Sequence, residues 1–333
     1  MTLTGIGSAT GIGSMPGEDF ASTMRLVTDE LPELVHLPEL PARGAHASMV
    51  GRSAALLEGL GADLQPAGWR LTDAPGLDQR RAVSLLAQDL DMLEETLQGY
   101  DGRLKVQVAG PWTLAATIER PRGDRVLADH GARRDLAQSL AAGIGAHVAD
   151  VRRRVGGAGL LVQVDEPALP AVLAGRIPTA SGFGRHRTID VSEADRALRW
   201  TVEAVRAAGA APVVHSCAGD VPVGLLAGAG FDALAFDPGE VDRGAYDDFS
   251  AAFDGGLDLW PGVVPTTEPA GEPSDRDLVR RVRGFLGALG FDPDGTGGRV
   301  VVTPSCGLSG ASPAWARRAL TLARTTARAL AAP

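Results

Sequence analysis

The chain has 333 residues, of which 44% are hydrophobic and 22% charged, a composition that is ordinary for a soluble globular protein. Its formal charge of −9 and the lack of a basic stripe argue against a nucleic-acid partner. No apolar run is long enough to cross a membrane, and no signal peptide is recognisable at the N-terminus. Two cysteines in a chain without an export signal are typical of a reducing compartment, so we expect a cytoplasmic protein with no membrane partner.

Short apolar runs alternate with longer helical stretches along the chain, which predicts parallel strands joined by crossover helices. We predict eight strands, at Thr4–Gly11, Leu34–Leu37, Leu104–Ala109, Gly159–Val164, Pro212–His215, Ala233–Phe236, Leu257–Val263 and Val300–Thr303. Eight such repeats fit a closed barrel better than an open sheet, and the length of the chain is ordinary for one barrel. The sequence therefore predicts an α/β fold, a single (βα)8 TIM barrel over residues 1–333.

The intervening helices have recognisable boundaries. Apolar residues at helical spacing predict a helix over Asp78–Gln98. N-terminal helix signals are expected at Ser192 with Asp195, at Ser274 with Asp277, and at Ser312 before Pro313. Two longer segments, Leu60–Leu77 and Arg176–Thr188, are predicted to be loops that serve either as lids over the site or as plain surface insertions.

The two cysteines are the strongest functional signal. Cys217 and Cys306 follow the fifth and eighth predicted strands, and His215 ends the fifth. Active sites of such barrels lie at the carboxyl ends of the strands, and imidazole with thiolates suits zinc. A buried histidine and two small buried thiols are the alternative, but their common position favours a metal site. The fourth ligand is expected to be Asp237, or else Glu240 three residues later.

Other polar residues at the strand ends indicate a substrate site. Asp165 and Glu166 follow an apolar run and would be costly to bury unpaired, so they are expected to bind an ammonium group or hold another ligand. The alternative is an acid pair at a helix N-terminus. Exposed amides near Ser14 suit a carboxylate, and Trp112 after the third strand is expected to contact substrate.

Four motifs occur in chain order: Ile12-Gly13-Ser14-Met15-Pro16, Asp165-Glu166-Pro167-Ala168-Leu169, His215-Ser216-Cys217 and Pro304-Ser305-Cys306-Gly307-Leu308. Together they resemble the catalytic domain of cobalamin-independent methionine synthase, whose superfamily also contains uroporphyrinogen decarboxylase and thiol methyltransferases. The resemblance runs from the first predicted strand to the last. It implies a Zn2+ cofactor held by His215, Cys217 and Cys306, with Asp237 at the position of the family's glutamate ligand.

The resemblance also implies a substrate and a reaction. The substrate would be homocysteine, with its carboxylate on Gly13 and Ser14 and its amine on Asp165. A second acid, after the second strand, corresponds to Glu39. Zinc would activate the thiol, which then takes a methyl group from a methyl-tetrahydrofolate or a corrinoid protein.

The chain departs from the family pattern in three ways. It has one barrel where the large enzymes have two, and the zinc glutamate is shortened to an aspartate. The family's acid histidine is missing, because Thr266 or Thr267 stands there. Glu268, His36 or a water could protonate the donor instead, and we take Asp165 and Glu268 as the expected catalytic residues.

Two other functions compete with methyl transfer. A decarboxylase of the same superfamily would need arginines and an aspartate at the barrel mouth and no thiol pair, so the two cysteines argue against it. A non-catalytic zinc- or thiol-binding barrel, accessory to methionine metabolism, is compatible with the missing acid histidine.

Overall fold

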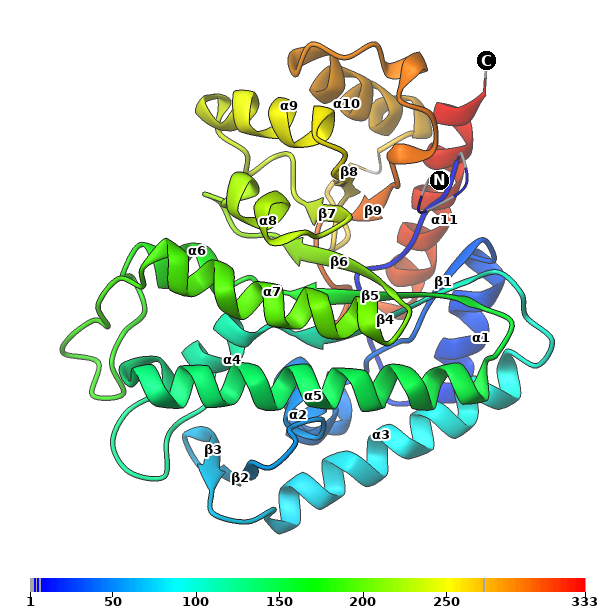
Figure 1. Ribbon diagram of the computed structural model, residues 1–333. Coiled ribbons are helices and arrows are strands. Elements are labelled where there is room, and N and C mark those ends of the chain that lie inside the picture. Colours follow the sequence, from blue (N-terminus) through cyan, green and yellow to red (C-terminus); the bar gives the residue numbers. More distant parts are fainter. Residues whose placement is uncertain (1–2, 4, 6, 272, 333) are drawn as a thin grey trace.

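The computed structural model describes residues 3, 5, 7–271 and 273–332. Within them, seven parallel strands form one curled sheet in the order β1-β4-β5-β6-β7-β8-β9 (Figure 1). The strands are β1 (Leu34–His36), β4 (Arg103–Ala109), β5 (Gly159–Asp165), β6 (Ala211–Ser216), β7 (Ala233–Phe236), β8 (Asp258–Val264) and β9 (Thr303–Pro304). Each neighbouring pair is parallel, as the alternation of strands and helices predicts.

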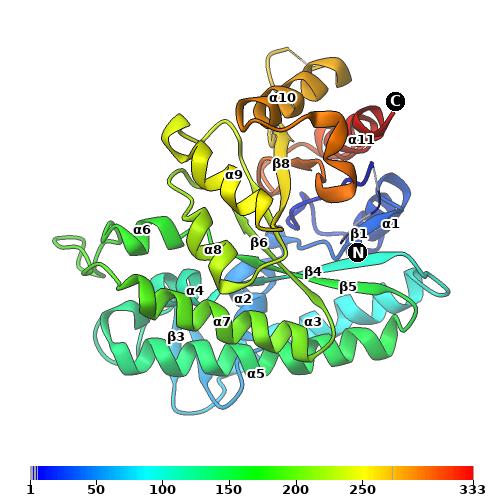
Figure 2. The ribbon, with the colours of Figure 1, turned by 45° about the horizontal axis from the view of Figure 1, so that its top comes forward.

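Helices cover the outer side of this sheet (Figures 1 and 2). They are α1 (Phe20–Glu30), α2 (Met49–Ala54), α3 (Leu77–Thr96), α4 (Pro111–Thr117), α5 (His130–Arg154), α6 (Leu169–Leu173), α7 (Val191–Ala207), α8 (Val223–Ala229), α9 (Tyr246–Asp254), α10 (Asp275–Ala288) and α11 (Pro313–Ala331). The chain thus has the outer helical layer of an α/β barrel.

The first predicted strand is the main correction to the barrel prediction. Part of Thr4–Gly11 lies outside the described residues, and the described part forms no strand. Isolated parallel bridges instead join Ala9 to Val302 and Ser14 to Glu39. The segment is rich in glycine, which offers no side chain to pack in a strand. The complete eight-stranded barrel is therefore not confirmed: the described residues form a seven-stranded parallel sheet, and this segment lies between its two edges.

A small hairpin replaces the first predicted loop. β2 (Gly61–Gln65) and β3 (Gly68–Thr72) pair in antiparallel register, and Gly68 has a φ of 128°, a conformation that favours glycine. Glycine, alanine and aspartate begin β2, so its sequence lacks the β-branched residues that indicate a strand. The second segment, Arg176–Thr188, remains a loop with one bridge between Pro178 and Arg185.

The helix boundaries mostly agree with the sequence. Ser274 forms a capping box with Asp277, and Ser312 caps α11, so both predictions are confirmed. The cap of α7 is Asp190, whose carboxylate accepts from the amide of Ser192. Ser192 therefore lies inside the helix that it was expected to begin.

The concave face of the sheet carries both apolar and polar side chains. An apolar cluster contains residues from strands that are far apart in the sheet order, which is possible only inside the curl. Its buried members are Ile12, Leu34, Leu161, Val213, Ala233, Ala235, Trp260 and Val301. Alternate residues share a face of a strand, so Gln163 and Asp165 follow Leu161 on this inner face. Polar groups therefore line the inner face towards the carboxyl ends of the strands.

Candidate metal and substrate site

The carboxyl ends of the strands bring three metal-capable side chains together. His215 lies near the end of β6, Cys217 follows that strand, and Cys306 lies two residues beyond β9. β7 and β8 separate β6 from β9 in the sheet, so the curl of the sheet is what brings the two cysteines together. Residues 89 positions apart in the sequence thereby become neighbours.

The geometry of this cluster suits a metal ion. One ligand atom from each of His215, Cys217 and Cys306 lies within 4.8 Å of the others, and the two sulfurs are 2.7 Å apart. The Nδ1 atom of His215 is 2.9 Å from Oδ1 of Asp165. Its Nε2 atom is buried and has no hydrogen-bond partner among the described residues. An unpartnered imidazole nitrogen beside two sulfurs is the donor set that zinc prefers, so these residues fit that ion.

The charges in the cluster are strongly coupled. Burial alone would lower the pKa of His215, but Asp165 and the nearby Cys306 outweigh it and raise the pKa to about 9. The contact with Cys217, opposed by burial and supported by His215, lowers the pKa of Cys306 to about 4. The same contact and burial raise the pKa of Cys217. These shifts favour the ionised form of Cys306 over that of Cys217, and metal binding, which needs deprotonated ligands, would release protons from the cluster.

The expected fourth ligands lie outside this cluster. Asp237 directly follows β7, and its Oδ1 accepts from the amide of Gly239 at 2.8 Å. Asp237 and Ser305, which precedes Cys306, line one cavity of about 640 Å³ at the mouth of the sheet. Glu240 is exposed. Either carboxylate would have to turn towards the cysteines to bind the same ion.

The glycine-rich segment before α1 borders the cysteine loop. The amide of Leu308 donates to the carbonyl of Ser14 at 2.8 Å. A Cβ atom at Gly307 would collide with Oγ of Ser14, so the two loops lie in close contact and a side chain at position 307 would require this hydroxyl to move. A side chain at Gly13 would likewise press on Gln107, at 3.1 Å. Gly13 and Ser14 therefore lie beside the loop that carries Cys306.

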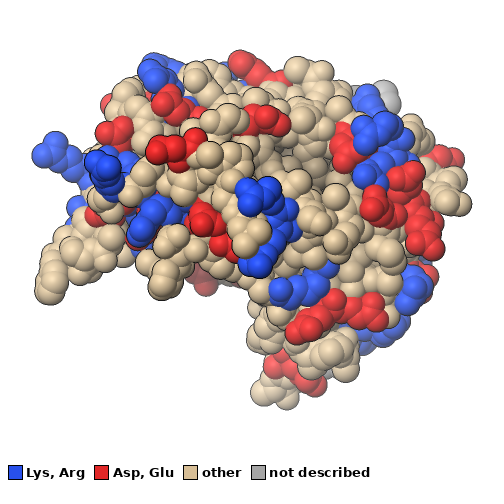
Figure 3. Space-filling view, turned by 90° about the horizontal axis from the view of Figure 1, so that it is seen from below, with Lys and Arg blue, Asp and Glu red and all other residues tan. Residues whose placement is uncertain are grey.

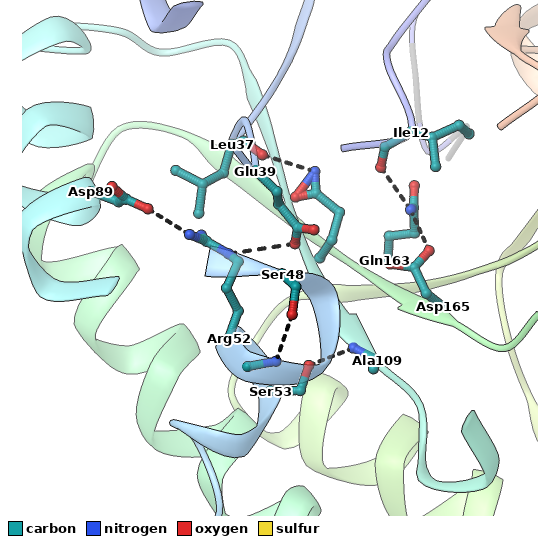
Figure 4. A network of polar contacts seen from close by, with 12 residues as sticks. Ile12, Leu37, Glu39, Ser48, Arg52, Ser53, Asp89, Ala109, Gln163 and Asp165 are labelled. Carbon is teal, nitrogen blue, oxygen red and sulfur yellow. Dashed lines mark hydrogen bonds and ion pairs between the residues drawn. The ribbon is translucent and has the colours of Figure 1, made fainter. Parts of the chain in front are cut away.

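Glu39 belongs to a buried polar network (Figure 4). It is 4% exposed, and its side chain is 3.5 Å from Nε of Arg52 on α2. Arg52 also pairs with Asp89 on α3, and Arg43 pairs with the same carboxylate. Burial, opposed by Arg52, raises the pKa of Glu39 to about 7. No sequence motif indicates Arg52 or Asp89, because their proximity to Glu39 depends on how α2 and α3 pack.

Glu166 and Trp112 use their polar atoms elsewhere. The buried carboxylate of Glu166 accepts from the amides of Trp112 and Thr113 at the N-terminus of α4, at 2.9 and 2.8 Å. Burial outweighs these bonds and raises the pKa of Glu166 to about 7. The indole of Trp112 is 2% exposed and donates to the carbonyl of Ala194. Asp165 and Glu166, adjacent in sequence, therefore face opposite sides of the sheet.

The two side chains expected to protonate a donor have different surroundings. Glu268 lies after β8 and is exposed. His36 is completely buried and accepts from the amide of Gly11 through Nδ1. Burial, aided by Lys105, lowers the pKa of His36 well below its ordinary value. His36 is therefore neutral and enclosed, whereas Glu268 is accessible.

Residues 96–329 match the family model described as cobalamin-independent synthase, catalytic domain. The chain belongs to this family. The match includes Asp165, His215, Cys217 and Cys306, whereas Gly13, Ser14 and Glu39 precede it. A comparison with curated proteins gives no match.

Two solved structures share the fold of this cobalamin-independent synthase homologue. A B12-independent methionine synthase from Shewanella sp. W3-18-1, in complex with selenomethionine, is 12% identical over 98% of both chains, with a TM-score of 0.63. A β-mannanase from the blue mussel Mytilus edulis is 12% identical over 96% of this chain and 92% of its own, with a TM-score of 0.51. At such identities the likeness concerns the fold alone.

The surface of this family member carries mixed charge. On the face seen in Figure 3, acidic and basic side chains are interspersed and neither sign dominates. Across the part of the chain that the structure describes, no helix is long and apolar enough to cross a membrane.

Proposed function

We propose that this chain is a zinc-dependent methyltransferase that transfers a methyl group to a thiol, with homocysteine as acceptor and methionine as product. In this proposal residues 1–333 form one zinc-binding catalytic unit. The observation that carries it is the convergence of two cysteine sulfurs on the unpartnered Nε2 of His215, at the strand ends of a chain from this family.

The proposed ligands are His215, Cys217 and Cys306, with Asp237 turning inwards as the fourth. Zinc, when bound, would lower the pKa of a substrate thiol so that it is a thiolate at neutral pH. The hydrogen bond from Nδ1 of His215 to Asp165 supports this arrangement, because it fixes the ring with Nε2 towards the sulfurs.

The proposed substrate contacts surround the metal ligands. Gly13 and Ser14 would bind the carboxylate of homocysteine, and Glu39 and Asp165 its ammonium group. Both hydrogen bonds that described residues form with the Asp165 side chain go to Oδ1, which leaves Oδ2 available for an ammonium. Asp165 would therefore bind substrate and orient His215 at the same time.

The methyl donor is proposed to be a methyl-tetrahydrofolate or a methyl-corrinoid protein. A methyl group on a tertiary amine leaves readily only if the nitrogen is protonated. Glu268 is our proposed proton donor, because it is exposed near the mouth of the sheet, whereas His36 is completely buried.

X-ray absorption at the zinc edge, with and without homocysteine, tests the proposal. We expect zinc with two sulfur ligands, and a third sulfur after homocysteine is added. A protein without zinc, or a zinc site that gains no sulfur, would overturn it.

A non-catalytic thiol-binding protein accessory to methionine metabolism is the second candidate. It is favoured by Glu268, whose exposed side chain forms no hydrogen bond or ion pair with any of the described residues that would hold it towards a substrate. Methyl transfer to homocysteine, measured with both donor classes, separates the two functions. A third sulfur on zinc without any product would favour the accessory role.

A further inference from the structure

A lysine is enclosed within the sheet below the proposed site. Lys105 on β4 is completely buried, and it is the only lysine among the 32 Lys and Arg residues of the chain. Its Nζ atom donates to the carbonyl of Ile12 at 2.9 Å and to Oε1 of Gln163 at 2.6 Å. A buried amine is costly unless it is hydrogen-bonded, so these two contacts hold it in place.

The contacts of Gln163 determine which way its amide points. Its Nε2 atom is 2.8 Å from the carbonyl of Ile12 and 2.7 Å from Oδ1 of Asp165, as Figure 4 shows. A carbonyl and a carboxylate only accept hydrogen bonds, so the amide nitrogen must face them. The amide oxygen then faces Lys105, which donates to it. A flipped amide would lose all three bonds.

This fixed amide sets the direction of the next hydrogen bonds. Oδ1 of Asp165 accepts from Gln163, and it also lies 2.9 Å from Nδ1 of His215. An ionised carboxylate can only accept, so Nδ1 of His215 carries the proton. Nε2 is then the nitrogen that gives up its proton when a metal binds, and its lone pair faces Cys217 and Cys306.

We propose that Lys105 and Gln163 are positioning residues that raise the zinc affinity of the site by fixing the donors to Asp165 and thereby the tautomer of His215. The inference rests on the proposed zinc function. Neither residue touches the metal or the substrate. They act through a chain of hydrogen bonds that runs from Lys105 through Gln163 and Asp165 to His215.

The residue type at position 105 agrees with this role. The other basic residues of the chain are arginines, so a lysine here is an exception to the chain's own composition. A compact amine can donate to both Gln163 and the Ile12 carbonyl within a closed space, whereas a planar guanidinium has five donors to satisfy. Both partners of Lys105 are accepting oxygens, so the amine donates to them whether charged or neutral.

Zinc affinity, measured by competition with a chromogenic chelator, is the first test. We expect Lys105→Met and Gln163→Met each to weaken zinc binding about 10-fold, the lower end of the range for residues behind metal ligands. Gln107→Met is the matched control. Gln107 lies opposite Gln163 in the strand register and is also buried. It donates to the carbonyl of Leu37 and does not belong to the series of hydrogen bonds from Lys105 to His215.

A spectroscopic readout distinguishes positioning from a general loss of structure. Protein labelled with 15N-lysine has one side-chain amine signal, from Lys105. We expect zinc to shift this signal in the wild type and in Gln107→Met. We expect no shift in Gln163→Met, because this variant lacks the hydrogen bonds that connect Lys105 to Asp165. Circular dichroism would verify that each variant is folded.

The outcomes separate this inference from the proposed function. Unchanged zinc affinity in both Lys105→Met and Gln163→Met, or equal loss in the Gln107→Met control, would overturn the positioning role and leave the zinc function standing. A wild-type protein that binds no zinc would overturn both.

Discussion

Replacing Asp165 with asparagine removes a negative charge from beneath His215 while keeping the size of the side chain. Asp165 is 5% exposed, and one of its oxygens accepts from both Gln163 and His215, at 2.7 and 2.9 Å. A hydrogen bond to a charged group contributes about 1.5–3 kcal/mol. Losing the charge-assisted bond to His215 should therefore weaken zinc binding by about 10- to 150-fold.

The assay is chelator competition for zinc, followed by calorimetric titration of homocysteine into the zinc-loaded protein. Asp165→Asn should weaken binding of both, because the same carboxylate is proposed to hold the substrate ammonium. Glu166→Gln is the matched control, since this neighbouring acid is also buried but accepts hydrogen bonds at the N-terminus of α4. Zinc affinity within twofold of wild type in Asp165→Asn would refute the orienting role of the carboxylate.

Three further predictions concern a cysteine, a buried acid and a pair of glycines. Cys306→Ala should abolish stoichiometric zinc in metal analysis, and full retention would refute the proposed ligand set. Burial raises the pKa of Glu166 from 4.5 to about 7, so folding favours its protonated form and stability falls as pH rises across that window. Urea midpoints at pH 5 and pH 8 should therefore differ less in Glu166→Gln than in wild type, and an equal difference would contradict this. On α5, a Cβ atom at Gly145 would meet open space, so Gly145→Ala should raise the free energy of unfolding by about 0.5–1 kcal/mol, measured in urea. Gly143→Ala would collide with the carbonyl of Leu56 and should destabilise by about 1–3 kcal/mol, so gains at both positions would refute the packing argument.

Strand positions followed from the sequence where apolar runs were long enough to be recognised. Ala233–Phe236 is observed as predicted, and Leu34–Leu37 differs by one residue. A strand was predicted at Thr4–Gly11, but its described residues form no strand, because an isolated bridge at Ala9 takes the place of a continuous ladder. The hairpin at Gly61–Thr72 was missed because its pairing depends on a turn at a glycine and not on apolar alternation.

The sequence predicted the positions of the cysteines in the candidate site, but not the surroundings of its commoner residue types. Cysteines are scarce in this chain, so their position at strand ends carried information. Trp112 and Glu166 also stand at strand ends, but position along a chain does not reveal which way a side chain points. Strand alternation could have separated Asp165 from Glu166, since adjacent residues face opposite sides. Lys105 belongs to no motif, and its role depends on contacts across the curled sheet.

Residues 9–15, which lie between the two edges of the sheet, are expected to open more readily than the strands. Isolated bridges at Ala9 and Ser14 hold this segment, whereas β4 and β5 share a seven-residue register. Elements with few pairing bonds open at low free energy, so amide hydrogens in residues 9–15 should exchange faster than those of β4. A thiol substrate that binds Gly13 and Ser14 would stabilise this segment between the sheet edges and slow its hydrogen exchange. Substrate recognition and closure of the sheet would then be one event.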